Sequence, residues 1–103
     1  MPLYAALGKV TPVGAADLKG SRERFQENQR VFEAYGARLI GGYAVLGPYD
    51  FLFIFEAPDN ETVLRLSAMT ASRGTSLYET MPIVPIEEFL RITDEIEEGR
   101  AGV

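Results

Sequence analysis

Four short stretches of the chain are apolar or alternate between apolar and polar residues, which is the pattern of β-strands. They cover residues 3–10, 37–46, 49–57 and 76–84. Proline and glycine lie at their ends, as expected where strands stop and turns begin. Only Gly47-Pro48 separates the second strand from the third, so we expect a two-residue hairpin with Gly47 at positive φ. The alternation then predicts that Tyr49 packs beneath the helices.

Between and after these strands, apolar residues recur every three or four positions, which predicts helices. The first helical region follows Thr11-Pro12 and extends to about Tyr35. The second is capped by Asp59 and extends to about Arg73. A last helix is predicted over residues 86–96, and we expect its Ile86, Phe89 and Leu90 to be buried, either within the chain or against a partner chain.

The order strand–helix–strand–strand–helix–strand predicts an α+β, ferredoxin-like βαββαβ fold with an extra C-terminal helix. The four-stranded antiparallel sheet should have the order 4-1-3-2 and carry two helices on one face. With 103 residues, the chain is expected to form a single domain over residues 1–103.

Side-chain alternation in the strands divides the sheet into two different faces. In each strand, one of the two alternating sets contains no charged residue, and this set should face the helices. Arg38 does not fit this pattern and is expected to lie outside the sheet. The opposite set has polar residues among aliphatic neighbours, namely Lys9, Tyr43, Asp50, Glu56 and Glu79. Such a face is too apolar for water and too charged for a simple core, so we expect a homodimer in which these faces oppose each other.

The same alternation defines a candidate ligand site on the face opposite the helices. Lys9 ends the first strand and Asp50 begins the third, so the two should meet and border a pocket with Tyr43 and Glu79 in its floor. Lys9, Asp50 or Glu79 would serve as acid–base groups, and Tyr43 would position a ligand. For most of these residues, a purely structural role, such as an ion pair that stabilises the fold, is the simpler interpretation. For Glu79, which lies mid-strand, a structural and a functional role are equally well supported. No catalytic residue is assigned.

Composition narrows the chemistry further. The chain has no cysteine and no histidine, which excludes disulfides, His-ligated haem, a typical zinc site and a Ser-His-Asp triad. We expect no metal and no cofactor. The net charge of −5 argues against nucleic acid as a partner. No apolar run is long enough to span a membrane, and neither a signal peptide nor an oxidising compartment is indicated, so the cytoplasm is the expected location.

Several short segments resemble the GYD-domain family of small, mostly prokaryotic proteins. These are Tyr4-Ala5-Ala6-Leu7, Leu46-Gly47-Pro48-Tyr49-Asp50, Glu56-Ala57-Pro58-Asp59 and Glu87-Glu88-Phe89. Pro48 interrupts a contiguous Gly-Tyr-Asp. The resemblance covers nearly the whole chain and implies a dimeric α/β-barrel, in a family whose biochemistry is largely unassigned.

Two classes of function are compatible with these observations. One is a small-molecule-binding barrel, including a cofactor-free enzyme of the oxygenase or isomerase class, with its site on the non-helix face. The alternative is a non-catalytic metabolite-sensing or oligomerisation module. A polar pocket of several hundred Å³ would favour the first class, and a filled barrel the second.

Overall fold

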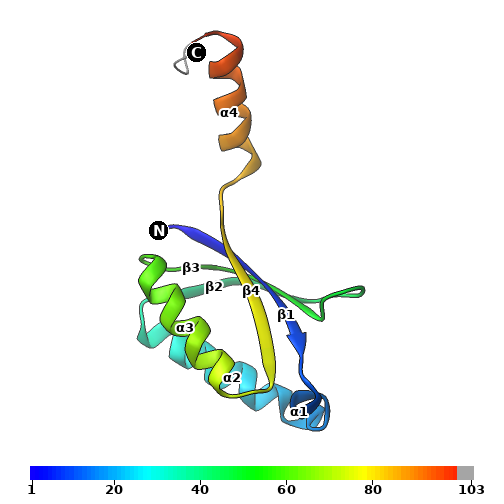
Figure 1. Ribbon diagram of the computed structural model, residues 1–103. Helices are drawn as coiled ribbons and strands as arrows, with labels where there is room; N and C mark the ends of the chain where they lie inside the picture. Colours follow the sequence, from blue (N-terminus) through cyan, green and yellow to red (C-terminus); the bar gives the residue numbers. More distant parts are fainter. Residues whose placement is uncertain (100–103) are drawn as a thin grey trace.

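The computed structural model describes residues 1–99 and consists of a four-stranded antiparallel sheet with two helices across one face (Figure 1). The strands are β1 (Leu3–Val10), β2 (Arg38–Ala44), β3 (Phe51–Glu56) and β4 (Ser76–Ile83). The covering helices are α2 (Ser21–Ala34) and α3 (Asn60–Ser72). The short helices α1 (Pro12–Ala15) and η1 (Leu18–Gly20) connect β1 to α2, and α4 (Ile86–Glu97) follows β4.

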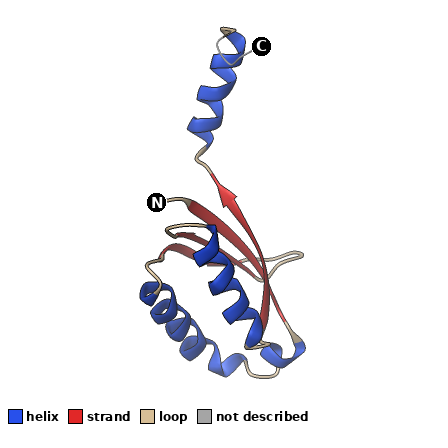
Figure 2. Ribbon diagram, turned by 60° about the vertical axis from the view of Figure 1, so that its left-hand side comes forward, coloured by secondary structure: helices blue, strands red, loops and turns tan. Residues whose placement is uncertain are grey.

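The sheet has the order β2-β3-β1-β4, which is the expected order 4-1-3-2 counted from the other edge. All neighbouring strands are antiparallel. The prediction of an α+β, ferredoxin-like arrangement is therefore confirmed. Figure 2 shows α2 and α3 together on one side of the sheet, with the other side left uncovered.

The core lies between the sheet and these two helices and is built largely from aromatic rings. Phe55 of β3 is 2% exposed and packs against Tyr4 of β1 and Phe32 of α2, with ring centroids 5.5 and 5.1 Å apart. Leu66 of α3 covers this cluster from above and is also 2% exposed. These side chains follow the predicted alternation, because Tyr4 and Phe55 belong to the uncharged sets of their strands.

Strand β2 departs from the simple alternation because it contains a bulge. Leu39 pairs with Phe55, but the next paired residue is Gly41, opposite Ile54, so Ile40 is an extra residue. Leu39 therefore packs on the core, although continuous alternation would have put it on the face of Tyr43.

The expectation that Arg38 lies outside the sheet is wrong. Arg38 begins β2 and pairs with Glu56 of β3, and its Nε lies 2.8 Å from the Glu56 carboxylate. On an edge strand, a charged side chain can pair with a neighbour and still reach water. Arg38 is accordingly tolerated inside the sheet.

The connection from β2 to β3 is longer than the predicted two residues. It spans residues 45–50 and is closed by a hydrogen bond from the Val45 N–H to the Asp50 carbonyl, 2.9 Å long. Gly47 does have positive φ, at 106°, as predicted. Tyr49 lies in this loop rather than in β3, so it does not take the alternation of Phe51, and the expectation that it packs beneath the helices is wrong.

Helix α4 forms where it was predicted, but within this chain its apolar residues are not buried. It projects from the end of β4 away from the sheet (Figure 1). Ile86, Phe89 and Leu90 are between 50% and 61% exposed. The radius of gyration is 16.6 Å, whereas a compact chain of this length would have about 13 Å. No helix within residues 1–99 is long and apolar enough to cross a membrane.

Candidate functional site

The bare face of the sheet is the face that carries the candidate residues. Tyr43, Leu52, Leu7 and Glu79 form one row across β2, β3, β1 and β4. Tyr43 and Glu79 therefore lie on opposite edge strands, three strand spacings or roughly 14 Å apart. They share a face but do not meet, and two leucines fill the row between them.

Glu79 contacts a tyrosine, but that residue is Tyr49 from the β2–β3 loop. The Tyr49 hydroxyl donates a hydrogen bond of 2.6 Å to Glu79 Oε2. Lys9 Nζ lies 5.9 Å from the centre of the Tyr49 ring, within cation–π range. The three residues form a small cluster at one end of the bare face, which we call the Lys9–Tyr49–Glu79 cluster.

The electrostatics of this cluster favour a protonated tyrosine. The hydrogen bond to Glu79, together with the negative charge of that carboxylate, raises the pKa of Tyr49 above its ordinary value of 10.0. Tyr49 is thus a hydrogen-bond donor at neutral pH and is poorly suited to act as a base. Glu79 itself is exposed to water in the single chain, although it lies in the middle of its strand.

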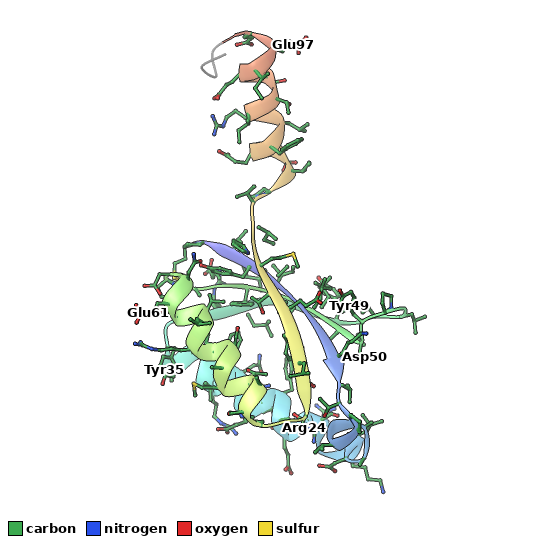
Figure 3. All side chains as sticks on the ribbon, in the orientation of Figure 1. Arg24, Tyr35, Tyr49, Asp50, Glu61 and Glu97 are labelled. Carbon is green, nitrogen blue, oxygen red and sulfur yellow. The ribbon has the colours of Figure 1, made fainter. Side chains whose placement is uncertain are left out.

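Asp50 has a local structural role. Its Oδ2 accepts a hydrogen bond of 2.9 Å from the Val10 N–H, and its own N–H donates to the Gly8 carbonyl at 2.8 Å. Asp50 thereby holds the loop onto the last residues of β1 (Figure 3). The expected ion pair between Asp50 and Lys9 is not among the ion pairs of the described residues, because the carboxylate is directed at the backbone.

Tyr43 folds back along its own strand. A Cβ placed on Gly41 would lie 3.1 Å from the Tyr43 ring and hydroxyl, so the glycine leaves room for the ring. The side chain is 57% exposed. Of the four candidate residues, then, Lys9 and Glu79 lie near one another because both approach Tyr49.

Tyr49 is the site residue that the sequence pattern did not reveal. The strand alternation predicts that the third strand begins at Tyr49, although Pro48 directly before it cannot donate to a sheet ladder. An aspartate directly after Tyr49 is a second signal, because Asp is common in turns and loops. Together these two signals could have placed Tyr49 in a loop.

The rest of the bare face is mostly apolar. Leu3, Ala5, Leu7, Ile54, Met81 and Ile83 lie in its rows, and Leu77 next to Lys9 is 57% exposed. At the far end of this face, the charged residues are the Arg38–Glu56 pair. Within residues 1–99, no three acidic side chains come close enough together to hold a metal ion. The face thus has charged groups at its two ends and an apolar middle.

Two adjoining hollows lie on the other side of the sheet, between β-strand residues and helices α2 and α3. Their volumes are about 70 and 140 Å³. They share five lining residues: Phe25, Asn28, Phe53, Thr70 and Tyr78. They are therefore parts of one crevice, on the face where the sequence predicted only core.

Comparison with known proteins agrees with the segments noted in the sequence. The model of the GYD domain family matches residues 4–93. The chain belongs to the GYD domain family.

One relative of this chain has a name that states what it binds. The chain is 38% identical over 91 residues to the "Glutamine synthetase and cystathionine beta-lyase binding protein" of Thermus thermophilus. The aligned region covers 87% of this chain and 96% of the relative. That relative is named for the enzymes it binds, which indicates a binding or regulatory role for a protein of this kind.

Proposed function

We propose that this protein is a non-catalytic binding module that works as a homodimer, with the bare faces of two sheets packed together. The observation that carries the proposal is the apolar middle of that face, which the two helices on the other side cannot cover. A sheet face of this kind is an interaction surface. In the dimer, the Lys9–Tyr49–Glu79 cluster would lie at the rim or within the enclosed space.

The surface area of the chain supports the proposal that a second chain covers part of its surface. The chain exposes 7166 Å², whereas a compact monomer of 11.4 kDa would expose about 5,800 Å². The excess of roughly 1,400 Å² for one chain is larger than the area of about 800 Å² that each partner hides in a standard interface. Both the bare face and helix α4 contribute to it.

Catalysis on the bare face, which the sequence left open, has less support. Tyr49 is held protonated, Asp50 is bound to backbone, and Tyr43 lies far from Glu79. Both hollows described above lie on the opposite side of the sheet. A small molecule enclosed between the two subunits remains compatible with the dimer, but a binding role explains the exposed apolar residues directly.

Helix α4 supports a protein partner in addition to the second copy. Its apolar stripe of Ile86, Phe89, Leu90 and Ile96 is exposed, as in helices that bind in the groove of another protein. Because a relative is named for binding glutamine synthetase and cystathionine beta-lyase, we propose that this chain binds an enzyme of the same kind through α4. We place this activity in the cytoplasm, as the composition suggested.

The oligomeric state tests the first half of the proposal. Sedimentation velocity at micromolar concentration should give twice the chain mass of 11.4 kDa, and Ile54→Lys on the bare face should give a monomer because it buries a charge at the interface. Leu64→Lys is the matched control, since Leu64 of α3 is 70% exposed on the opposite side. A monomeric wild-type protein, or a dimer that survives Ile54→Lys, would contradict the proposal.

Calorimetric titration with purified glutamine synthetase and cystathionine beta-lyase of the source organism tests the second half. The wild-type dimer should bind one of them, and Phe89→Ser with Leu90→Ser should abolish binding while the dimer persists. Glu87→Gln, on the polar side of the same helix, should bind normally. Loss of the dimer in the double variant would instead assign α4 to the subunit interface.

A further inference from the structure

The crevice between the sheet and helices α2 and α3 has two chemically different ends. The smaller hollow is lined mainly by aromatic and aliphatic side chains, among them Phe25, Phe32, Phe53, Phe55 and Leu66. The larger hollow adjoins it and is bordered by Arg24 and Arg73. An apolar interior with a few convergent polar groups is typical of small-molecule sites.

Helix α2 leaves this space open. None of its residues is fully buried, and Phe25, which faces the crevice, is 39% exposed. Phe25 contacts Phe53 of β3 with ring centroids 6.1 Å apart, and Tyr78 of β4 lies 6.0 Å from the same Phe53 ring. The three rings form an aromatic wall that is reached from outside between α2 and α3.

The two arginines differ in their partners. Arg24 forms an ion pair with Asp17 at 3.1 Å. Arg73 donates a hydrogen bond to the amide oxygen of Asn28 and has no carboxylate partner among the ion pairs of residues 1–99. Glu27 is the acidic group near Arg73, but its pKa is lowered first by its own hydrogen-bonded partner, Arg30. The charge of Arg73 also lowers the pKa of Glu27, but less than Arg30 does. Of the two arginines at the crevice, Arg73 is therefore the one that forms no ion pair within residues 1–99.

We propose that this crevice binds a small monocarboxylate with an apolar body of about one ring, held with the ring against Phe25, Phe53 and Tyr78 and the carboxylate at Arg73. The two hollows, of about 70 and 140 Å³, together provide enough space, because an apolar cavity of roughly 150 Å³ holds one benzene molecule. The carboxylate would form a charge-assisted hydrogen bond with Arg73, which forms no ion pair within residues 1–99. The site lies on the opposite side of the sheet from the dimer interface, so it does not depend on the proposed function.

The binding of phenylacetate to the intact protein, followed by amide chemical shifts in NMR spectra, tests this site. We expect saturable binding with a dissociation constant of about a millimolar or tighter, and shifts centred on α2, α3 and β4. Benzyl alcohol, which lacks the carboxylate, should bind more weakly in the same place. An absence of saturation, or shifts centred on the bare face, would overturn the proposal.

Three variants separate the parts of the site. Arg73→Met should weaken phenylacetate binding about tenfold, a loss typical of one charge-assisted contact, and leave benzyl alcohol unchanged. Ser67→Leu, which fills the apolar hollow, should weaken both ligands. Arg65→Met, on α3 where Arg65 pairs with Glu61, is the control and should change neither.

The outcomes lead to different conclusions, provided that each variant keeps the thermal stability and amide spectrum of a folded protein. If Ser67→Leu weakens binding and Arg73→Met does not, the crevice binds neutral apolar molecules and the carboxylate assignment is wrong. If neither variant weakens binding, phenylacetate binds elsewhere and the proposal fails. If Ser67→Leu does not fold, Phe25→Ala takes its place, because it removes one ring of the aromatic wall and should weaken both ligands; unchanged binding would overturn the proposal.

Discussion

Neighbouring residues in β3 have opposite environments even though both are apolar. Phe55 points to the helices and is almost completely buried, whereas Ile54 points to the bare face and keeps part of its surface in water. Alternation gives both faces an apolar surface, but only two helices are available to cover the sheet. Burial inside the chain thus marks the residues that stabilise the fold, and uncovered apolar residues mark the surface that we propose a second copy hides.

Replacing one residue on each face should have effects that differ in size and in their dependence on protein concentration. Phe55→Ala should cost about 3–5 kcal/mol of unfolding free energy at any concentration, because it leaves a cavity in the core. Ile54→Ala should cost clearly less in dilute solution, and its cost should rise with concentration if a dimer forms. Urea unfolding at two protein concentrations measures both. If Phe55→Ala and Ile54→Ala lost the same unfolding free energy at low concentration, the two faces would not differ in how they stabilise the single chain.

The β2–β3 loop places Tyr49 against Glu79 on the bare face, and we expect its conformation to depend on Gly47. Gly47→Ala should cost about 1–2 kcal/mol, because a side chain at positive φ is strained, although a Cβ there would contact nothing. Leu46→Ala is the control, since Leu46 is fully exposed in the same loop and should change stability by less than about 0.5 kcal/mol. Chemical denaturation decides between them, and similar losses for both variants would mean that the loop is not constrained by this glycine.

Helix α4 carries a third apolar surface, in addition to the two faces of the sheet. Phe89→Ala should cost less than about 1 kcal/mol in dilute solution, because Phe89 is 54% exposed in the chain alone. Full burial would instead give about 3–5 kcal/mol. Chemical denaturation at a concentration where sedimentation shows a monomer is the appropriate measurement. A loss of several kcal/mol under those conditions would show that the chain covers its own helix.

The smallest expected effect concerns the Lys9–Tyr49–Glu79 cluster. Because Tyr49 has a raised pKa, its hydrogen bond stabilises the folded state fully below pH 10, the ordinary tyrosine value, and this contribution is lost as the pH rises through the raised pKa. Glu79→Gln should bring the pKa of Tyr49 back toward its ordinary value, because the negative charge is removed. NMR titration of ring-labelled tyrosine measures it, with Glu56→Gln as control. An unchanged Tyr49 pKa in Glu79→Gln would mean that the two side chains do not interact in solution.

Much of the fold could be predicted because it depends on local patterns. The periods of two and of three to four residues located the four strands and the long helices, and the order of elements restricted the sheet to one arrangement. Gly47 was identified as a residue of positive φ because few other residues accept that conformation. The helical character of residues 86–96 was equally local.

The errors occurred where alternation was extended past an irregularity. The bulge at Ile40 moved Leu39 to the core, and the six-residue loop moved Tyr49 away from it. Neither irregularity changes the apolar character of the segment, so the period alone does not reveal it. The expected Lys9–Asp50 pair failed for a related reason, because Asp50 binds backbone groups that have no signature in the sequence.

The sequence by itself determined the element order, the sheet order and the existence of a second apolar face, because these follow from the spacing of side chains along each strand. Only the tertiary structure decided that Tyr49 meets Glu79, that Tyr43 lies across the sheet from it, and that the crevice opens between α2 and α3 on the helix side. These contacts join residues far apart in the chain, and their geometry depends on loop length, on one bulge and on how closely two helices pack.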